Sequence, residues 1–289
     1  MPQGVTNGSC AGHQLITHPV SSRLSQLFGA SVAAFEDGRS MAIGAPGSAS
    51  RGLEGEVFIY SAVFESSTRK AGTRLRWGLD QTLVLARRFV PLLGSGMRWR
   101  QLGFSMAASE GRLVVGVKLY PQGAVTPIGG VVMATREHGD PSKQLHLAGT
   151  IIPPEYEIMP SNATVQPVTY ANGTLSLSQP GVQSFGHALS VTDQYLAIGA
   201  PNDASPSTVA LRGATILFRS EDSNILGPMA GRSILRPLPR PGGMLEETAG
   251  ARFGSAVVVT PGQVLIGAPE GSVSTGKLFG YSSYVLFPI

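Results

Sequence analysis

A box that ends in Gly-Ala-Pro occurs three times in this chain and constrains its fold more than any other feature. A Phe-Gly pair precedes each box, and its Phe lies 16, 14 and 14 residues before the box glycine. A weaker fourth copy has Leu102 in place of the Phe, and Val-Lys follows its box glycine. The residues that define the repeat are Phe28, Gly29, Gly44, Ala45, Pro46, Gly103, Gly116, Phe185, Gly186, Gly199, Ala200, Pro201, Phe253, Gly254, Gly267, Ala268 and Pro269. Units that start 68 to 83 residues apart with nearly constant internal spacing indicate a repeat architecture.

Each unit continues with two further β-rich runs, so it is predicted to contain four short strands. The third strands are expected at 55–60, 130–134, 213–218 and 276–281, and the fourth at 82–91, 144–153, 233–239 and 284–289. The 37 glycines, 21 prolines and 14% of charged residues suit short strands joined by turns. We therefore predict an all-β fold in which four-stranded antiparallel blades form a β-propeller.

The predicted organisation is an N-terminal tail followed by the propeller repeats. The tail covers 1–12 and the repeats cover 13–289, with a polar insert at 154–184. The blades are expected near 28–91, 102–153, 185–239 and 253–289.

Steric arguments explain the repeated residues as scaffold. Blades converge toward the propeller axis, so the box needs small residues, and glycine permits close approach of another backbone. Proline cannot donate a hydrogen bond to the next strand, so it is expected to end the second strand. The Phe of each Phe-Gly pair is expected to wedge between neighbouring blades.

The segments "FGASVAAFEDGRSMAIGAP", "FGHALSVTDQYLAIGAP" and "FGSAVVVTPGQVLIGAP" resemble FG-GAP repeats, the units of integrin alpha-chain propellers and related surface proteins. The resemblance covers residues 13–289 and implies a propeller, usually seven-bladed, that acts in extracellular adhesion or ligand binding. Only four repeats are present. The run 13–20 either is the last strand of a preceding unit, as in a fragment of a longer propeller, or closes the ring by pairing with the last blade.

Members of that family often carry a calcium loop between the Phe-Gly strand and the box. The corresponding connections here are "FEDGRS", "SEGR", "TDQ" and "TPGQ", and none offers more than two acidic residues. Calcium takes six to eight oxygen ligands, several of them carboxylates. We therefore predict tight hairpin turns, at Asp37-Gly38 and Glu110-Gly111 among others, and no calcium or other cofactor.

The chain shows no local signature of catalysis. The segment 271–278 fits a phosphate-binding loop only in part, because Leu278 stands where such a loop has Ser or Thr. The five histidines lack metal-ligand spacing, no nucleophile-elbow motif occurs, and Cys10 is the only cysteine. We predict that the chain is not an enzyme.

The region 69–100 carries eight basic residues and one acidic residue. Its candidate ligand-binding residues lie in 69–77, expected to be a loop after the third strand, and in 94–101, which follows the fourth. They are Arg74, Arg76, Trp77, Arg98, Trp99 and Arg100. Arginine beside tryptophan can bind acidic glycans, anionic membranes or acidic protein patches. The alternative is a solvated outer edge whose charges discourage strand pairing.

The predicted function is a binding module for extracellular protein or cell-adhesion recognition. Alternatives are a glycan-binding lectin of the same repeat class, a propeller attached to an enzyme outside this chain, and an assembly subunit. No nucleic-acid module, secretory signal or apolar run of 18 residues is found. Asn162 and Asn172 are candidate glycosylation sites in the polar insert, which fits a surface or extracellular location if the chain is part of a longer secreted protein.

Overall fold

The structure is a computed structural model that describes fourteen segments of the chain. They are 14–19, 27–35, 38–47, 54–66, 73–84, 98–109, 111–120, 129–136, 144–151, 184–202, 213–219, 231–235, 251–269 and 276–282. Every regular element in these segments is a β-strand, as predicted. In this part of the chain we therefore find no helix with the length and apolar character needed to cross a membrane.

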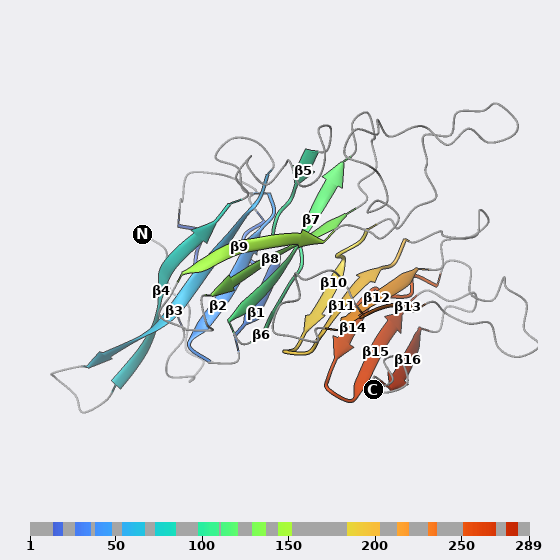
Figure 1. The fold of residues 1–289 in the computed structure, drawn as a ribbon. Helices are drawn as coiled ribbons and strands as arrows, with labels where there is room; N and C mark the ends of the chain where they lie inside the picture. The colour runs from blue at the N-terminus through green and yellow to red at the C-terminus, as the bar shows by residue number, and fades with distance from the viewer. Residues whose placement is uncertain are drawn as a thin grey trace, which may run out of the picture.

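The sixteen strands form four antiparallel sheets, and each repeat contributes one sheet (Figure 1). Sheet 1 has the order β1 (Ser31–Ala34), β2 (Ser40–Ala45), β3 (Glu56–Ser66), β4 (Thr73–Leu83). Sheet 2 contains β5 (Arg98–Arg100), β6 (Met106–Ser109), β7 (Arg112–Tyr120), β8 (Gly130–Arg136) and β9 (Leu145–Ile151). Sheet 3 has the order β10 (Ala188–Val191), β11 (Tyr195–Ala200), β12 (Ala214–Arg219), β13 (Gly231–Leu235). Sheet 4 has the order β14 (Ala256–Val259), β15 (Gln263–Ala268), β16 (Lys277–Ser282).

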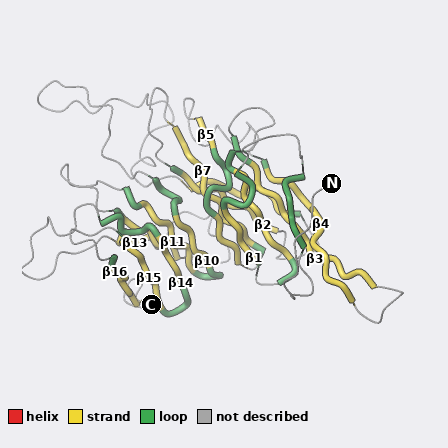
Figure 2. The backbone as a smooth tube through the Cα atoms, turned by 180° about the vertical axis from the view of Figure 1, so that it is seen from behind, coloured by secondary structure: helices red, strands yellow, loops and turns green. Residues whose placement is uncertain are grey.

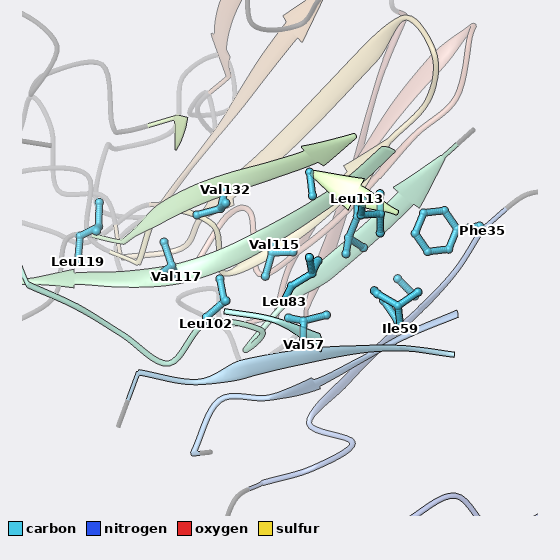
Figure 3. Close-up of a cluster of buried hydrophobic side chains, with 14 residues drawn as sticks. Phe35, Val57, Ile59, Leu83, Leu102, Leu113, Val115, Val117, Leu119 and Val132 are labelled. Carbon is cyan, nitrogen blue, oxygen red and sulfur yellow. The ribbon is translucent and has the colours of Figure 1, made fainter. Parts of the chain in front are cut away.

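The four sheets follow one another in a row, with sheets 1 and 4 at opposite ends (Figures 1 and 2). The first strands of neighbouring repeats contact each other, β1 with β6, β6 with β10, and β10 with β14. Because successive side chains point to opposite faces of a strand, each inner sheet serves two cores. In β7, for example, Leu113 and Val115 belong to the core between sheets 1 and 2, while Val114 belongs to the core between sheets 2 and 3. Figure 3 shows the first of these cores.

The box glycine is the point where each sheet meets the next. A Cβ atom added at Gly44 would overlap the carbonyl oxygen of Gly103, and one at Gly199 would overlap that of Gly254. At Gly116 the same carbonyl, from the following Phe-Gly pair, would lie 2.7 Å from the added atom. The expected close backbone approach is therefore confirmed, and the approaching backbone belongs to the Phe-Gly pair of the next repeat.

A second contact completes this junction between consecutive sheets. The glycine before each third strand forms a parallel bridge with the next repeat's Leu or Phe, in the pairs Gly55–Leu102, Gly129–Phe185 and Gly213–Phe253. Phe185 and Phe253 are fully buried, each between two sheets, so the predicted wedge is confirmed there.

The box proline ends the second strand as predicted. β2, β11 and β15 stop at the alanine before the proline. In the weaker copy, Lys118 occupies the proline position, and β7 continues to Tyr120. The missing proline therefore gives sheet 2 three additional paired residues.

Polar side chains add further ties between sheets. Arg136 is buried between sheets 1 and 2, where its guanidinium donates to Ser40 Oγ at 2.9 Å and lies 4.8 Å from the ring centre of Phe35. Ser109 Oγ donates to Asp193 Oδ1 at 2.9 Å, across sheets 2 and 3.

Three expectations about the connections need correction or lie outside the described residues. The predicted loop at 69–77 is wrong for its second half, because Thr73–Trp77 is the first part of β4, and 69–72 lie outside the described residues. Segment 14–19 belongs to none of the sheets, and it packs against sheet 1 instead. Asn162, Asn172, nearly all of the insert 154–184 and the expected strand at 284–289 lie outside the described residues.

Candidate functional site

The candidate site begins where sheet 2 departs from the regular repeat. The three residues that β7 gains pair with β5, in the register Arg98–Tyr120, Trp99–Leu119 and Arg100–Lys118. β5 comes from the basic stretch singled out in the sequence, and β7 from the repeat that lost its proline. The pairing places two cations, Arg100 and Lys118, directly opposite each other on neighbouring strands. Like charges in this arrangement destabilise a sheet.

The side chain of His187 lies near Lys118 and links this pair to a further basic residue, Arg252. His187 directly follows the Phe-Gly pair of sheet 3, and Arg252 directly precedes that of sheet 4. The electrostatic influence of both Arg252 and Lys118 reaches the imidazole of His187. We call Arg100, Lys118, His187 and Arg252 the cation cluster. Its members come from three consecutive sheets, and the box and the Phe-Gly pair place them at the same edge.

The cation cluster disfavours a further positive charge. Partial burial of the imidazole lowers the pKa of His187 below 6.5, and the positive charges of Arg252 and Lys118 lower it further. The residue as a whole is nevertheless exposed, as are Arg100 and Arg252. An anion that approached this edge would relieve the repulsion and favour protonation of His187.

Two aromatic rings lie under the cations. The ammonium of Lys118 is 5.9 Å from the ring centre of Phe104, and the guanidinium of Arg100 is 5.8 Å from that of Tyr120. Contacts of this kind stabilise and orient a cation. Among the described residues, no acidic side chain pairs with Lys118 or Arg100. The cluster is therefore held in place by aromatic contacts while its charge stays uncompensated at these two residues.

The structure separates the six candidate residues of the basic stretch into two groups. The β3–β4 hairpin extends beyond the first residue of β2, Ser40, which pairs with Ser61. This extension carries Arg74, Arg76 and Trp77. Arg98, Trp99 and Arg100 form β5 at the other end of the sheets, beyond the box. The side chains of Arg74 and Arg98 are outside the described part. Of the six, only Arg100 is placed in the cation cluster.

The two tryptophans pack into different cores and offer no common stacking surface. Trp77 packs on the free face of sheet 1, and Gln14 brackets its backbone with hydrogen bonds to both its N–H and its carbonyl, at 2.7 and 2.9 Å. Trp99 packs against the core between sheets 1 and 2, and its buried Nε1 has no hydrogen-bond partner.

The turns between the Phe-Gly strand and the box have structural roles where they are described. Gly38 and Gly111 adopt φ values of 60° and 64°, as their tight turns require. The carboxylate of Asp193 accepts the bond from Ser109 that joins sheets 2 and 3. Within the described segments, no three His, Cys, Asp or Glu side chains gather as metal ligands would.

No protein-family model matches the chain, and no curated protein matches it.

Sequence reasoning missed three members of the cation cluster. Lys118 was visible as the residue that replaces the box proline, and His187 and Arg252 as the neighbours of two Phe-Gly pairs. A search for charged residues at repeat-equivalent positions would have found all three. Their spacing along the chain, 69 residues between Lys118 and His187 alone, hides the fact that they share one edge.

Proposed function

We propose that the chain is a non-catalytic binding module whose cation cluster binds an acidic segment of a partner protein. The observation that carries this proposal is the convergence of Arg100, Lys118, His187 and Arg252 from three sheets. Lys118 and Arg100 face each other as like charges with no acidic partner among the described residues, and an acidic segment of a partner would offset that cost. Binding residues on the loops and strand ends of a rigid β-scaffold are common in recognition proteins.

The scaffold we propose is a β-propeller of the FG-GAP type, of the kind that acts in extracellular adhesion. Four successive antiparallel meanders support it, as do first strands that contact one another along the row. The same Phe-Gly and box-glycine junction at all three sheet boundaries supports it as well. The chain's sequence resemblance to FG-GAP repeats is the reason to place its partner outside the cell.

An acidic protein fits the cluster better than a glycan that stacks on aromatic rings. Phe104 and Tyr120 each already carry a cation over one face, which reduces the ring surface that a sugar could stack on. Trp77 and Trp99 are engaged in separate cores. The cluster therefore offers charge and little free aromatic surface.

The test measures binding of a fluorescent poly-glutamate peptide to the purified chain, with heparin as the acidic-glycan probe. We expect poly-glutamate to bind, and Lys118→Glu to weaken that binding tenfold or more, about 1.4 kcal/mol. Raising the salt from 50 to about 500 mM should weaken binding to the unmodified chain, because exposed charges are screened.

Arg219→Glu is the matched control. It makes the same charge change on sheet 3. Gly213, just before β12, bridges Phe253 beside Arg252, and Arg219 lies at the other end of β12, away from the cluster. Equal losses in the two variants would mean that net charge alone drives binding, and the proposal would fail. Binding of heparin without poly-glutamate would favour the lectin alternative instead.

A further inference from the structure

Sheet 4 has both glycines that form the junction between consecutive sheets, but no following Phe-Gly pair packs against them in the described structure. At Gly44 and Gly199, the space that a Cβ would need is taken by the next repeat's backbone. At Gly267, the equivalent position, an added Cβ would meet only Ala256 of its own sheet, at 3.3 Å. Gly276, which corresponds to the bridging glycines, has only Pro269 and Ala268 nearby. The socket for a following Phe-Gly pair is therefore built and unfilled in the described structure.

The face of sheet 4 around this socket is apolar and exposed. Val258 and Leu278 are 51% and 72% exposed, and they lie on the same face as Gly267 because Val258 pairs with Leu265, and Gly267 with Leu278. The equivalent residues of sheet 3 are Ser190 and Thr215. Thr215 is fully buried at the junction with sheet 4, and Ser190 Oγ accepts a bond from the Val259 N–H of that sheet. This face of sheet 3 is therefore buried by sheet 4, whereas the equivalent face of sheet 4 is exposed.

The opposite end of the row presents the complementary part. Among the described residues, nothing lies within 4 Å of a Cβ added at Gly29 of the first Phe-Gly pair, whereas Gly103 and Gly254 contact the sheet before them. Leu27 and Val32 beside it are each 59% exposed. The backbone of this turn has the same conformation as the Phe-Gly turn that packs against sheet 3. Its φ values, 52° at Leu27 and 85° at Gly29, match 51° and 91° at Arg252 and Gly254.

Segment 14–19 supports the same reading of this end. Ile16 packs on the outer part of the free face of sheet 1, and the ring of His18 lies 5.0 Å from that of Phe58 and 5.5 Å from that of Phe28. In the core between sheets 2 and 3, Ile151 of the fourth strand of sheet 2 is buried among residues of both sheets. Segment 14–19 thus contacts Phe28 and Phe58 on this face, while Leu27 and Val32 stay exposed beside Gly29.

We propose that the free face of sheet 4 docks the Phe-Gly end of sheet 1 of a second copy of this chain. The contact would repeat a junction that the chain makes three times internally, with Gly29 of one copy against Gly267 of the other. A head-to-tail contact between identical copies either closes into a ring or extends as a chain. Burial of the exposed leucine and valine side chains would supply its hydrophobic stabilisation.

The experiment measures the mass of the purified chain by sedimentation velocity from about 1 to 100 μM. We expect association that increases with concentration, to a closed dimer or to longer species. Gly267→Ala should weaken it at least tenfold, because the added methyl group would take the place of the incoming carbonyl. The matched control is Gly262→Ala in the β14–β15 turn of the same sheet, where an added Cβ meets nothing within 4 Å.

Leu278→Glu is a second variant that keeps the test independent of the glycine. Its side chain is exposed, so the fold should tolerate the change, as circular dichroism and the thermal midpoint can verify. The proposal is overturned if the unmodified chain stays monomeric throughout. It is also overturned if Gly267→Ala and Leu278→Glu, both folded, associate as the unmodified chain does.

Discussion

At the residue scale, His187 shows how position in the repeat decides chemistry. The residue after the Phe-Gly or Leu-Gly pair is Ala30, Phe104, His187 and Ser255 in the four repeats. Only in sheet 3 is it titratable near neutral pH, and there the flanking sheets supply Lys118 and Arg252. A position that is neutral elsewhere becomes a proton-sensitive group because of what the adjoining sheets place beside it.

The lowered pKa of His187 predicts a pH-dependent stability. The unfolded chain binds this proton below about pH 6.5, while the folded chain resists it, so the free energy of unfolding should fall as the pH drops from 7.5 to 5.5. His187→Gln should remove this part of the dependence. Urea unfolding of both proteins at the two pH values measures the difference, and 0.5 M NaCl should reduce the contribution of Lys118 and Arg252. Parallel pH dependences for the two proteins would contradict the prediction.

At the scale of the element, the length of β7 results from the absence of the box proline. Gly-Ala-Pro ends the second strand in three repeats, but Gly116-Val117-Lys118 leaves β7 free to run on to Tyr120 and to pair with β5. One residue type thus decides both the length of a strand and the formation of another strand. The cation cluster exists because of this change, since the longer β7 carries Lys118 beside Arg100.

Lys118→Pro should restore the regular repeat and release β5. Proline lacks the N–H and disfavours extended pairing in the middle of a strand. We expect faster amide hydrogen exchange at Trp99, Arg100 and Leu119, with unchanged protection in β8 and β9. Lys118→Ala, which removes the charge but keeps the N–H, is the control and should leave the exchange of β5 unchanged. Faster exchange throughout sheet 2 would show that the extension supports the whole sheet, contrary to this prediction.

At the scale of the whole molecule, the described contacts that hold the row together run between neighbouring sheets. Three of the cores each join two consecutive sheets, and each boundary uses the same glycine junction. Stability in such repeat architectures is approximately a sum of the repeats and their nearest-neighbour interfaces. A substitution at one junction should therefore act locally on the row and leave the other boundaries intact.

Gly199→Ala should separate sheet 4 from the rest. Its methyl group would overlap the Gly254 carbonyl, and relieving the overlap requires the two backbones to move apart. We expect a loss of about 1–3 kcal/mol at this boundary, the usual cost of overpacking a core. Hydrogen exchange should rise in β14–β16 and remain unchanged between sheets 1 and 2. A loss below about 0.5 kcal/mol, within the range of ordinary surface substitutions, would contradict the role given to this glycine.

The sequence by itself determined the parts of the protein that are local and repeated. Strand period, turn glycines, box prolines and the four-unit division could be predicted because each depends on residues a few positions apart. The burial of Phe185 and Phe253 followed from the same repeat. Less could be predicted where a repeat departs from the pattern, and the start of β4 at Thr73 was missed for this reason.

Only the tertiary structure decided which distant residues meet. It placed Arg100 opposite Lys118, brought His187 and Arg252 to the same edge, and sent Trp77 and Trp99 into different cores. It also left the junction of sheet 4 open at Gly267. The physical reason is that these contacts arise between sheets, where the repeat fixes the backbone path but the side chains that meet come from separate copies with independent sequences.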